Sequence, residues 1–193
     1  MSSRERRPIR SAAPTFEPVT LEQAKTQVRI SIENIDHDDY LNRLIAQARE
    51  QFENDTSVIC ATGTFTLKLD CFDDDDIDLP LRPVTAISSI TYKDSDGTTQ
   101  TFSSSKYALS TSGAMPEIVL AYNEVWPSVR GHRDDVTITF VAGYATAADV
   151  PEMVKQAILL EVKNQFESED VSKMSENFGY TMLSRRFERP TYP

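Results

Sequence analysis

The densest set of groups that could do chemistry in this 193-residue chain is a run of aspartates. Its members are Asp70, Asp73, Asp74, Asp75, Asp76 and Asp78. Clustered carboxylates can bind calcium through oxygen. An EF-hand loop, however, needs a central glycine and a closing glutamate, and this segment has neither. Strand-like alternation would also direct the carboxylates to different sides. The pattern therefore favours a solvated acidic loop, with a calcium-binding module as the weaker alternative.

The residues that usually carry catalysis are sparse and scattered. The chain has two histidines, His37 at an expected helix start and His132 in a charged loop. It has neither a nucleophile elbow, a Walker loop nor a dinucleotide-binding glycine motif. Cys60 and Cys71 lack metal-ligand spacing. Paired carboxylates stay open as general acid and base, because sequence does not show which of them meet. We predict no catalytic residue, no metal, no cofactor and no enzymatic activity.

The apolar residues predict the elements that must position any site. With 39% hydrophobic and 26% charged residues, one domain with terminal arms is expected. Thr20 and Gln23 have the spacing of a capping box. Apolar residues at helical spacing predict helices over residues 20–30, 37–55 and 150–167. No stretch approaches the ~20 apolar residues of a membrane span, and the N-terminus lacks a signal-peptide core.

The third helix carries an apolar ridge that should bury against the others. Its members are Val150, Val154, Ile158, Val162 and Phe166. Leu159 lies off this ridge, on the face of Lys155 and Lys163, so it should be exposed in the monomer. An exposed leucine is ordinary, and we advance a subunit interface at Leu159 only as a hypothesis.

Residues 63–144 change from helical period to period two, as in Phe65, Leu67 and Leu69. The strand expected over 84–92 keeps its pattern only with a bulge near Ser88 and Ser89. An antiparallel β-unit inserted into a small helical bundle gives an α+β fold. This domain would span residues 16–167.

Both termini read as arms. Residues 1–15 form a flexible basic arm with Arg4, Arg6, Arg7 and Arg10, which is either solvated or touches nucleic acid or an acidic partner. The net charge of −10 argues against DNA binding over the whole surface. Residues 168–193 mix arginine with aromatics, the composition of an interface. Those residues are Phe178, Tyr180, Arg185, Arg186, Phe187, Arg189 and Tyr192. A partner-bound arm is favoured over one that folds back on its own domain.

Several phrases in order resemble one known family. Residues 18–25 read PVTLEQAK, residues 79–92 read LPLRPVTAISSITY, and residues 140–144 read FVAGY, followed by Val150-Pro151 and residues 155–158. Residues 38–56 resemble the family's second helix. This pattern is similar to the head-to-tail connector, or adaptor, proteins of tailed bacteriophages, also described as head-completion or possible DNA-packaging proteins.

The resemblance implies a structural role in the virion neck. Such adaptors form a ring, commonly of twelve copies, beneath the portal, where they extend the DNA channel and present a surface for a stopper or tail protein. The resemblance makes the C-terminal residues named above, from Phe178 to Tyr192, a candidate portal-binding arm. A carboxylate-lined lumen would repel phosphates, so Asp73, Asp74, Asp75 and Asp76 could face the channel. A tail-side terminator or stopper is the structural alternative.

Overall fold

The computed structural model describes residues 7–72, 76–168 and 177–188. The chain divides into two compact units, each built from separate stretches of sequence. Residues 14–61 and 144–193 form a helical unit, and residues 1–13 and 62–143 form a sheet unit. The α+β class predicted from the sequence is confirmed. Within the described residues, no helix has the length and apolar character needed to cross a membrane.

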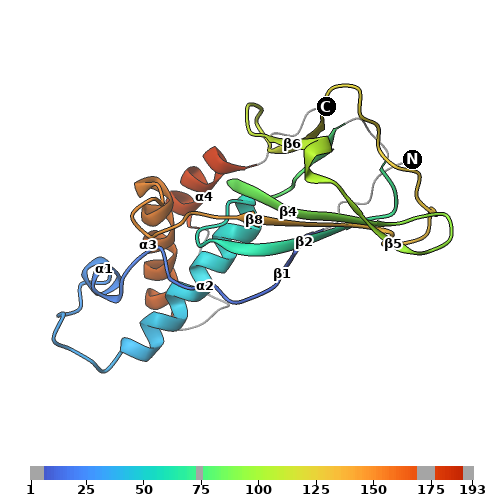
Figure 1. Cartoon of the computed structure of the whole chain (residues 1–193). Coiled ribbons are helices and arrows are strands. Elements are labelled where there is room, and N and C mark those ends of the chain that lie inside the picture. Colours follow the sequence, from blue (N-terminus) through green and yellow to red (C-terminus); the bar gives the residue numbers. More distant parts are fainter. Residues whose placement is uncertain (1–6, 73–75, 169–176, 189–193) are drawn as a thin grey trace. The chain divides into compact units, whose positions relative to one another are not determined.

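The helical unit contains α1 (Leu21–Gln27), α2 (Asp38–Thr56), α3 (Glu152–Glu167) and α4 (Phe178–Ser184), followed by the 3-10 turn η3 (Arg185–Phe187) (Figure 1). Thr20 and Gln23 form the predicted capping box, with the Gln23 N–H donating to Thr20 Oγ1 at 3.2 Å. The helix predicted to reach residue 30 ends at Gln27 instead. Arg29 adopts a left-handed φ of 61°, and the Ile30 N–H donates to the Lys25 carbonyl, which closes the helix as a Schellman motif.

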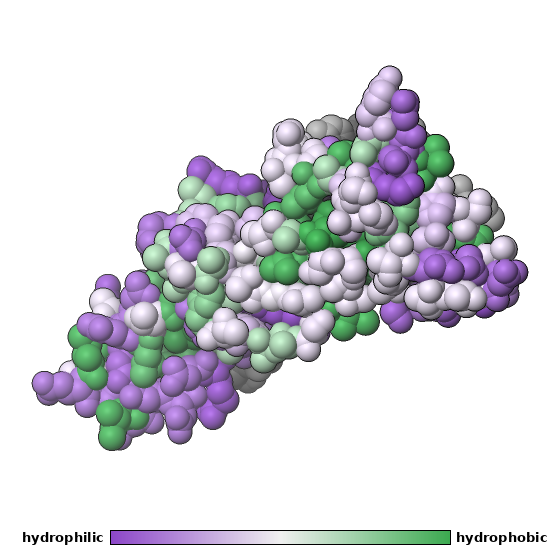
Figure 2. All heavy atoms as spheres, in the orientation of Figure 1, coloured by the Kyte–Doolittle hydropathy of each residue, from purple (hydrophilic) through white to green (hydrophobic). Residues whose placement is uncertain are grey.

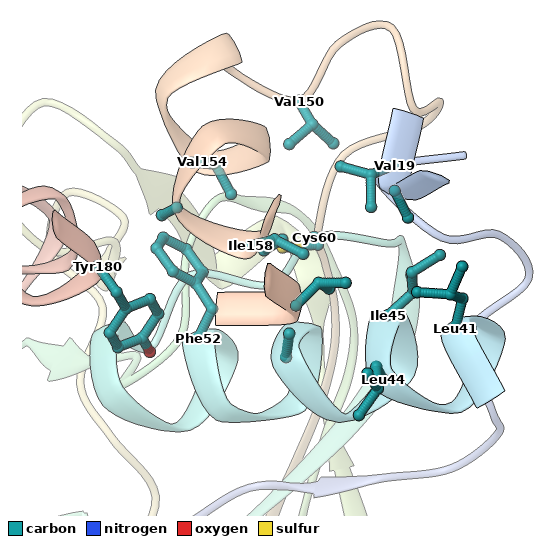
Figure 3. Packing of buried hydrophobic residues seen from close by; sticks show 14 of the residues in the cluster. Val19, Leu41, Leu44, Ile45, Phe52, Cys60, Val150, Val154, Ile158 and Tyr180 are labelled. Atoms are coloured by element: carbon teal, nitrogen blue, oxygen red, sulfur yellow. The ribbon is translucent and has the colours of Figure 1, made fainter. Parts of the chain in front are cut away.

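The core of the helical unit lies between α2 and α3 (Figure 3). Leu41, Ile45 and Phe52 of α2 and Val154 and Ile158 of α3 are at most 2% exposed. Burial of each such side chain is worth roughly 1.5–3 kcal/mol. The apolar ridge predicted for the third helix is therefore the face that binds this core.

Residues 178–188 belong to this unit and do not form an extended arm. Tyr180 is 5% exposed and is a member of the core cluster, and Leu183 and Phe187 pack against it. The Phe52 ring lies edge-on to Tyr180 and Phe187, at centroid distances of 6.5 and 5.9 Å. This part of the C-terminal segment follows the alternative in which it folds back on its own chain.

The sheet unit holds a five-stranded antiparallel sheet of order β1-β2-β8-β4-β5 (Figure 1). Its strands are β1 (Ile9–Arg10), β2 (Gly63–Leu69), β8 (Val136–Ala142), β4 (Val84–Lys93) and β5 (Thr99–Phe102). The central strand, β8, alternates buried and half-buried residues along its length, as a strand with one core face requires. The register of β4 against β8 shifts between Ile87 and Ser89, so the bulge predicted near Ser88 and Ser89 is confirmed.

A second antiparallel sheet of order β3-β7-β6 completes this unit. It contains β3 (Ile77–Asp78), β7 (Glu117–Leu120) and β6 (Tyr107–Ser110), with the 3-10 turn η1 (Ser104–Lys106) before β6. Ile118 is fully buried, and it pairs with both Ile77 and Leu109 across the two ladders.

Two residues of the expected N-terminal arm are ordered instead. Ile9 and Arg10 pair with Thr66 and Phe65 at the edge of the five-stranded sheet. The Arg10 guanidinium lies 5.3 Å from the centre of the Phe65 ring, and this contact holds a residue that composition alone assigns to solvent. Arg4 and Arg6 lie outside the described residues, and Arg7 is exposed.

Candidate functional site

The aspartate run singled out in the sequence forms no metal cluster in the part of the chain that the structure describes. There, no group of three or more histidine, cysteine or carboxylate side chains could hold a metal ion. Asp70 accepts a hydrogen bond from the Asp134 N–H at 2.9 Å, and Asp76 and Asp78 are exposed. Asp73, Asp74 and Asp75 lie outside the described residues, so their position at a DNA channel stays a prediction.

The other conspicuous carboxylates of the sheet unit have structural partners. Asp94 accepts from the Thr98 N–H and from Gln100 Nε2, both at 2.9 Å, and the Gln100 bond holds the pKa of Asp94 below its ordinary value. Asp135 accepts from Arg130 Nη2 at 2.7 Å, and this bond likewise lowers the pKa of Asp135. Both carboxylates stabilise local segments of the sheet unit through these hydrogen bonds.

The two histidines are also engaged in local structure. The His37 ring lies edge-on to Phe166 at a centroid distance of 5.6 Å, in the helical unit. The backbone N–H of His132 donates to Asp135 in the sheet unit. These contacts give each residue a role in local structure.

Buried polar contacts fix α4 to the helical unit. The Tyr180 hydroxyl donates to Asp55 Oδ2 at 2.6 Å, across 125 residues of sequence. Burial and this bond to Asp55 raise the pKa of the Tyr180 hydroxyl, which therefore stays protonated as the donor. Asn177 Nδ2 donates to the Leu160 carbonyl and to the carboxylate of Glu161, which is 2% exposed. These bonds hold α4 in one orientation.

The outward side of α4 is a compact apolar and basic surface. Phe178 and Met182, one helical turn apart, are 78% and 55% exposed. Arg185 and Arg186 follow them and are exposed. We call Phe178, Met182, Arg185 and Arg186 the α4 surface. It contains three of the residues predicted to bind the portal, and Met182 was not among the predicted residues.

The other predicted portal-binding residues fall elsewhere. Tyr180 is a correction, since its buried ring and its bond to Asp55 place it in the core and not on the surface. Phe187 is half-buried against Phe52. Arg189 and Tyr192 lie outside the described residues, and their contact with a portal stays a prediction.

Leu159 is half-buried and packs against the core of its own unit. The expectation that it is exposed is therefore wrong, because the face it shares with Lys155 and Lys163 is itself partly covered. A subunit contact through Leu159 stays a prediction.

A second exposed apolar surface lies between α1 and α2. Ile32 and Ile35 are 56% and 75% exposed, and the acidic residues Glu33 and Asp36 are exposed beside them. We call these four residues the connection surface. Figure 2 shows apolar atoms among hydrophilic ones over this segment, at the lower left. Two isoleucines in an otherwise polar connector were the signal that could have indicated it.

The chain can now be compared with known proteins. The model of the Phage gp6-like head-tail connector protein family matches residues 18–125, more than half of the chain, and the chain therefore belongs to this family. This is the head-tail connector family that the phrases in residues 18–25 and 79–92 resemble. The phrase at residues 140–144 lies beyond the matched range. No curated protein matches the sequence.

Solved structures share the fold over nearly the whole chain. A chain in the virion of the native gene transfer agent particle has 20% identity and a TM-score of 0.81, covering 96% of this chain and 97% of its own. One in the neck of the empty particle, computed with C6 symmetry, has 22% identity and a TM-score of 0.78. One in the neck of the native particle, computed with C12 symmetry, has 20% identity and a TM-score of 0.71. The last two each cover 97% of both chains.

Proposed function

We propose that this head-tail connector protein is the adaptor, a ring of copies beneath the portal that extends the DNA channel toward the tail. The observation that carries the proposal is the fold, which is shared over 97% of the chain with proteins of particle necks computed with C6 and C12 symmetry. A ring of twelve copies is compatible with both symmetries. The net charge of −10 suits a channel through which DNA slides without being held.

Assembly of the ring should depend on the portal as a template. Acidic subunits repel one another at a distance, so a portal that binds each copy would offset this repulsion. We further propose that the C-terminal segment contacts the portal. Tyr180 and Phe187 pack within their own unit, so we assign this contact to the residues that follow Glu188, including Arg189 and Tyr192.

A variant that ends at Glu188 tests the portal contact. It should lose portal binding roughly 30-fold or more, since one arginine or tyrosine at the centre of an interface is worth about 2 kcal/mol or more. Its melting temperature should stay unchanged, because every contact described for the helical unit remains. Co-elution of the variant and the full chain with the portal measures the difference. Undiminished co-elution of the shortened chain would remove the C-terminal contact from the account.

The rival within the same class is a tail-side terminator or stopper. An adaptor binds the portal in the absence of every other neck protein. A terminator or stopper should not bind the portal alone. Binding of the full chain to isolated portal therefore separates the two.

A further inference from the structure

We propose that, in the ring, the α4 surface of one copy docks on the connection surface of the next copy. This inference rests on the ring stated under the proposed function and names the faces that would build it. Both surfaces belong to the helical unit, so their arrangement follows from the contacts inside that unit.

Both surfaces expose large apolar side chains. Phe178 and Met182 on one side and Ile32 and Ile35 on the other are all more than half exposed. Exposed apolar residues that gather in patches, and do not occur singly, mark interaction sites. Each patch is small, and each would be covered if it met the other.

Both surfaces are preformed. Lys25, which is 3% exposed, donates from Nζ to the Ile32 carbonyl at 3.1 Å and forms an ion pair with Asp38. The Asp38 N–H donates to the Ile35 carbonyl at 3.2 Å, which joins the connection to the start of α2. On the other surface, Tyr180 and Asn177 hold α4 as described above. Surfaces ordered in advance lose little conformational entropy on binding.

The charges of the two surfaces are complementary. Residues 28–39 carry Arg29 against the acidic residues Glu33, Asp36 and Asp39, while Asp38 is already paired with Lys25. Residues 178–188 carry Arg185 and Arg186 against Glu188. An acidic surface facing a basic one steers association and fixes its register. Arg185 and Arg186 are adjacent basic residues in a chain whose net charge is −10.

The α4 surface and the connection surface lie toward opposite ends of α2. The connection surface adjoins the first residue of α2 (Figure 1). In contrast, α4 contacts Phe52 and Asp55, which lie near the last residue of α2. The 19 residues of α2 span about 28 Å, so the surfaces lie toward opposite ends of this helix. Two different, complementary faces on opposite sides of a subunit are the requirement for a head-to-tail interface that closes into a ring.

Cysteine crosslinking tests the pairing. Ile35→Cys and Met182→Cys are introduced into separate chains, each with Cys71→Ser, while Cys60 is kept because it is fully buried. The two variants are mixed with the portal and treated with a short, flexible bis-maleimide. A covalent dimer should form in the mixture. Each variant alone should give none, because a head-to-tail contact does not bring two copies of the same surface together.

Charge reversal supplies the specificity control. Arg185→Glu and Arg186→Glu on the Met182→Cys chain should lower the dimer yield roughly tenfold, because like charges would then face each other across the interface. Glu33→Arg and Asp36→Arg on the Ile35→Cys chain should restore it. Circular dichroism melting curves confirm that each variant is folded.

The contrary results are distinct. A ring that assembles on the portal without the mixed dimer would overturn this interface and leave the adaptor proposal standing. Loss of portal binding by the reversed α4 surface that Glu33→Arg and Asp36→Arg do not restore would assign that surface to the portal and overturn the inference. A full chain that never assembles with the portal would overturn the adaptor proposal and the interface with it.

Discussion

A Phe52→Ala variant is expected to lose about 3–5 kcal/mol of unfolding free energy, the cost of removing a fully buried phenylalanine. Phe52 is 0% exposed, and its ring lies beside Tyr180 in Figure 3. Its ring contacts both Tyr180 and Phe187, so its removal should also weaken the attachment of α4. Denaturant unfolding measures the free energy, and amide hydrogen exchange over residues 178–184 measures the attachment.

Phe178→Ala is the matched control for this prediction. It removes the same atoms from a ring that is 78% exposed, so stability should change by no more than about 0.5 kcal/mol. Equal losses in the two variants would mean that Phe178 is covered in the free protein. In that case the α4 surface would not be available to another copy.

An Arg49→Met variant should lose about 3 kcal/mol of unfolding free energy, the lower end of the cost of breaking a buried ion pair, because the partly exposed carboxylates of Glu17 and Glu53 lose their buried cation. The Arg49 side chain is 4% exposed and reaches Glu17 at 2.8 Å and Glu53 at 3.0 Å. Burial lowers the pKa of the guanidinium, but attraction to Glu53 and Glu17 outweighs burial and raises the pKa above its ordinary value. Arg49 thus stays charged and joins the segment before α1 to α2.

The control for Arg49→Met is Arg43→Met, on the same helix. Arg43 is exposed and lies 5.8 Å from the centre of the Tyr40 ring, a contact worth about 0.5–1 kcal/mol at the surface. Thermal or urea unfolding of both variants makes the comparison. If the two substitutions cost the same, the Arg49 network contributes no more than a surface contact, and the prediction is wrong.

The long elements of this fold were predictable because their signals are local. The helix over Asp38–Thr56 follows from apolar periodicity, and the start of α1 follows from the spacing of Thr20 and Gln23. The bulge near Ser88 was predictable because it reconciles an imperfect alternation of side chains. In each case the physical cause lies within a few residues of its effect.

The elements that sequence missed depend on contacts between distant residues. A seven-residue helix such as α4 is marginal alone, and its stability comes from partners such as Asp55, 125 residues away. The strand conformation of Ile9 and Arg10 likewise depends on pairing with Thr66 and Phe65 of β2, which are distant in sequence. The connection surface had a partial signal in the two isoleucines of residues 31–36, but their exposure depends on which surfaces the rest of the chain leaves uncovered.

The most direct test of the adaptor proposal is the mass of the protein by light scattering, alone and after mixing with its portal. The account predicts a monomer alone and, with the portal, a complex whose added mass corresponds to one connector copy for each subunit of the portal ring. A protein that leaves the mass of the portal unchanged would contradict the account, and its place in the neck would then be on the tail side.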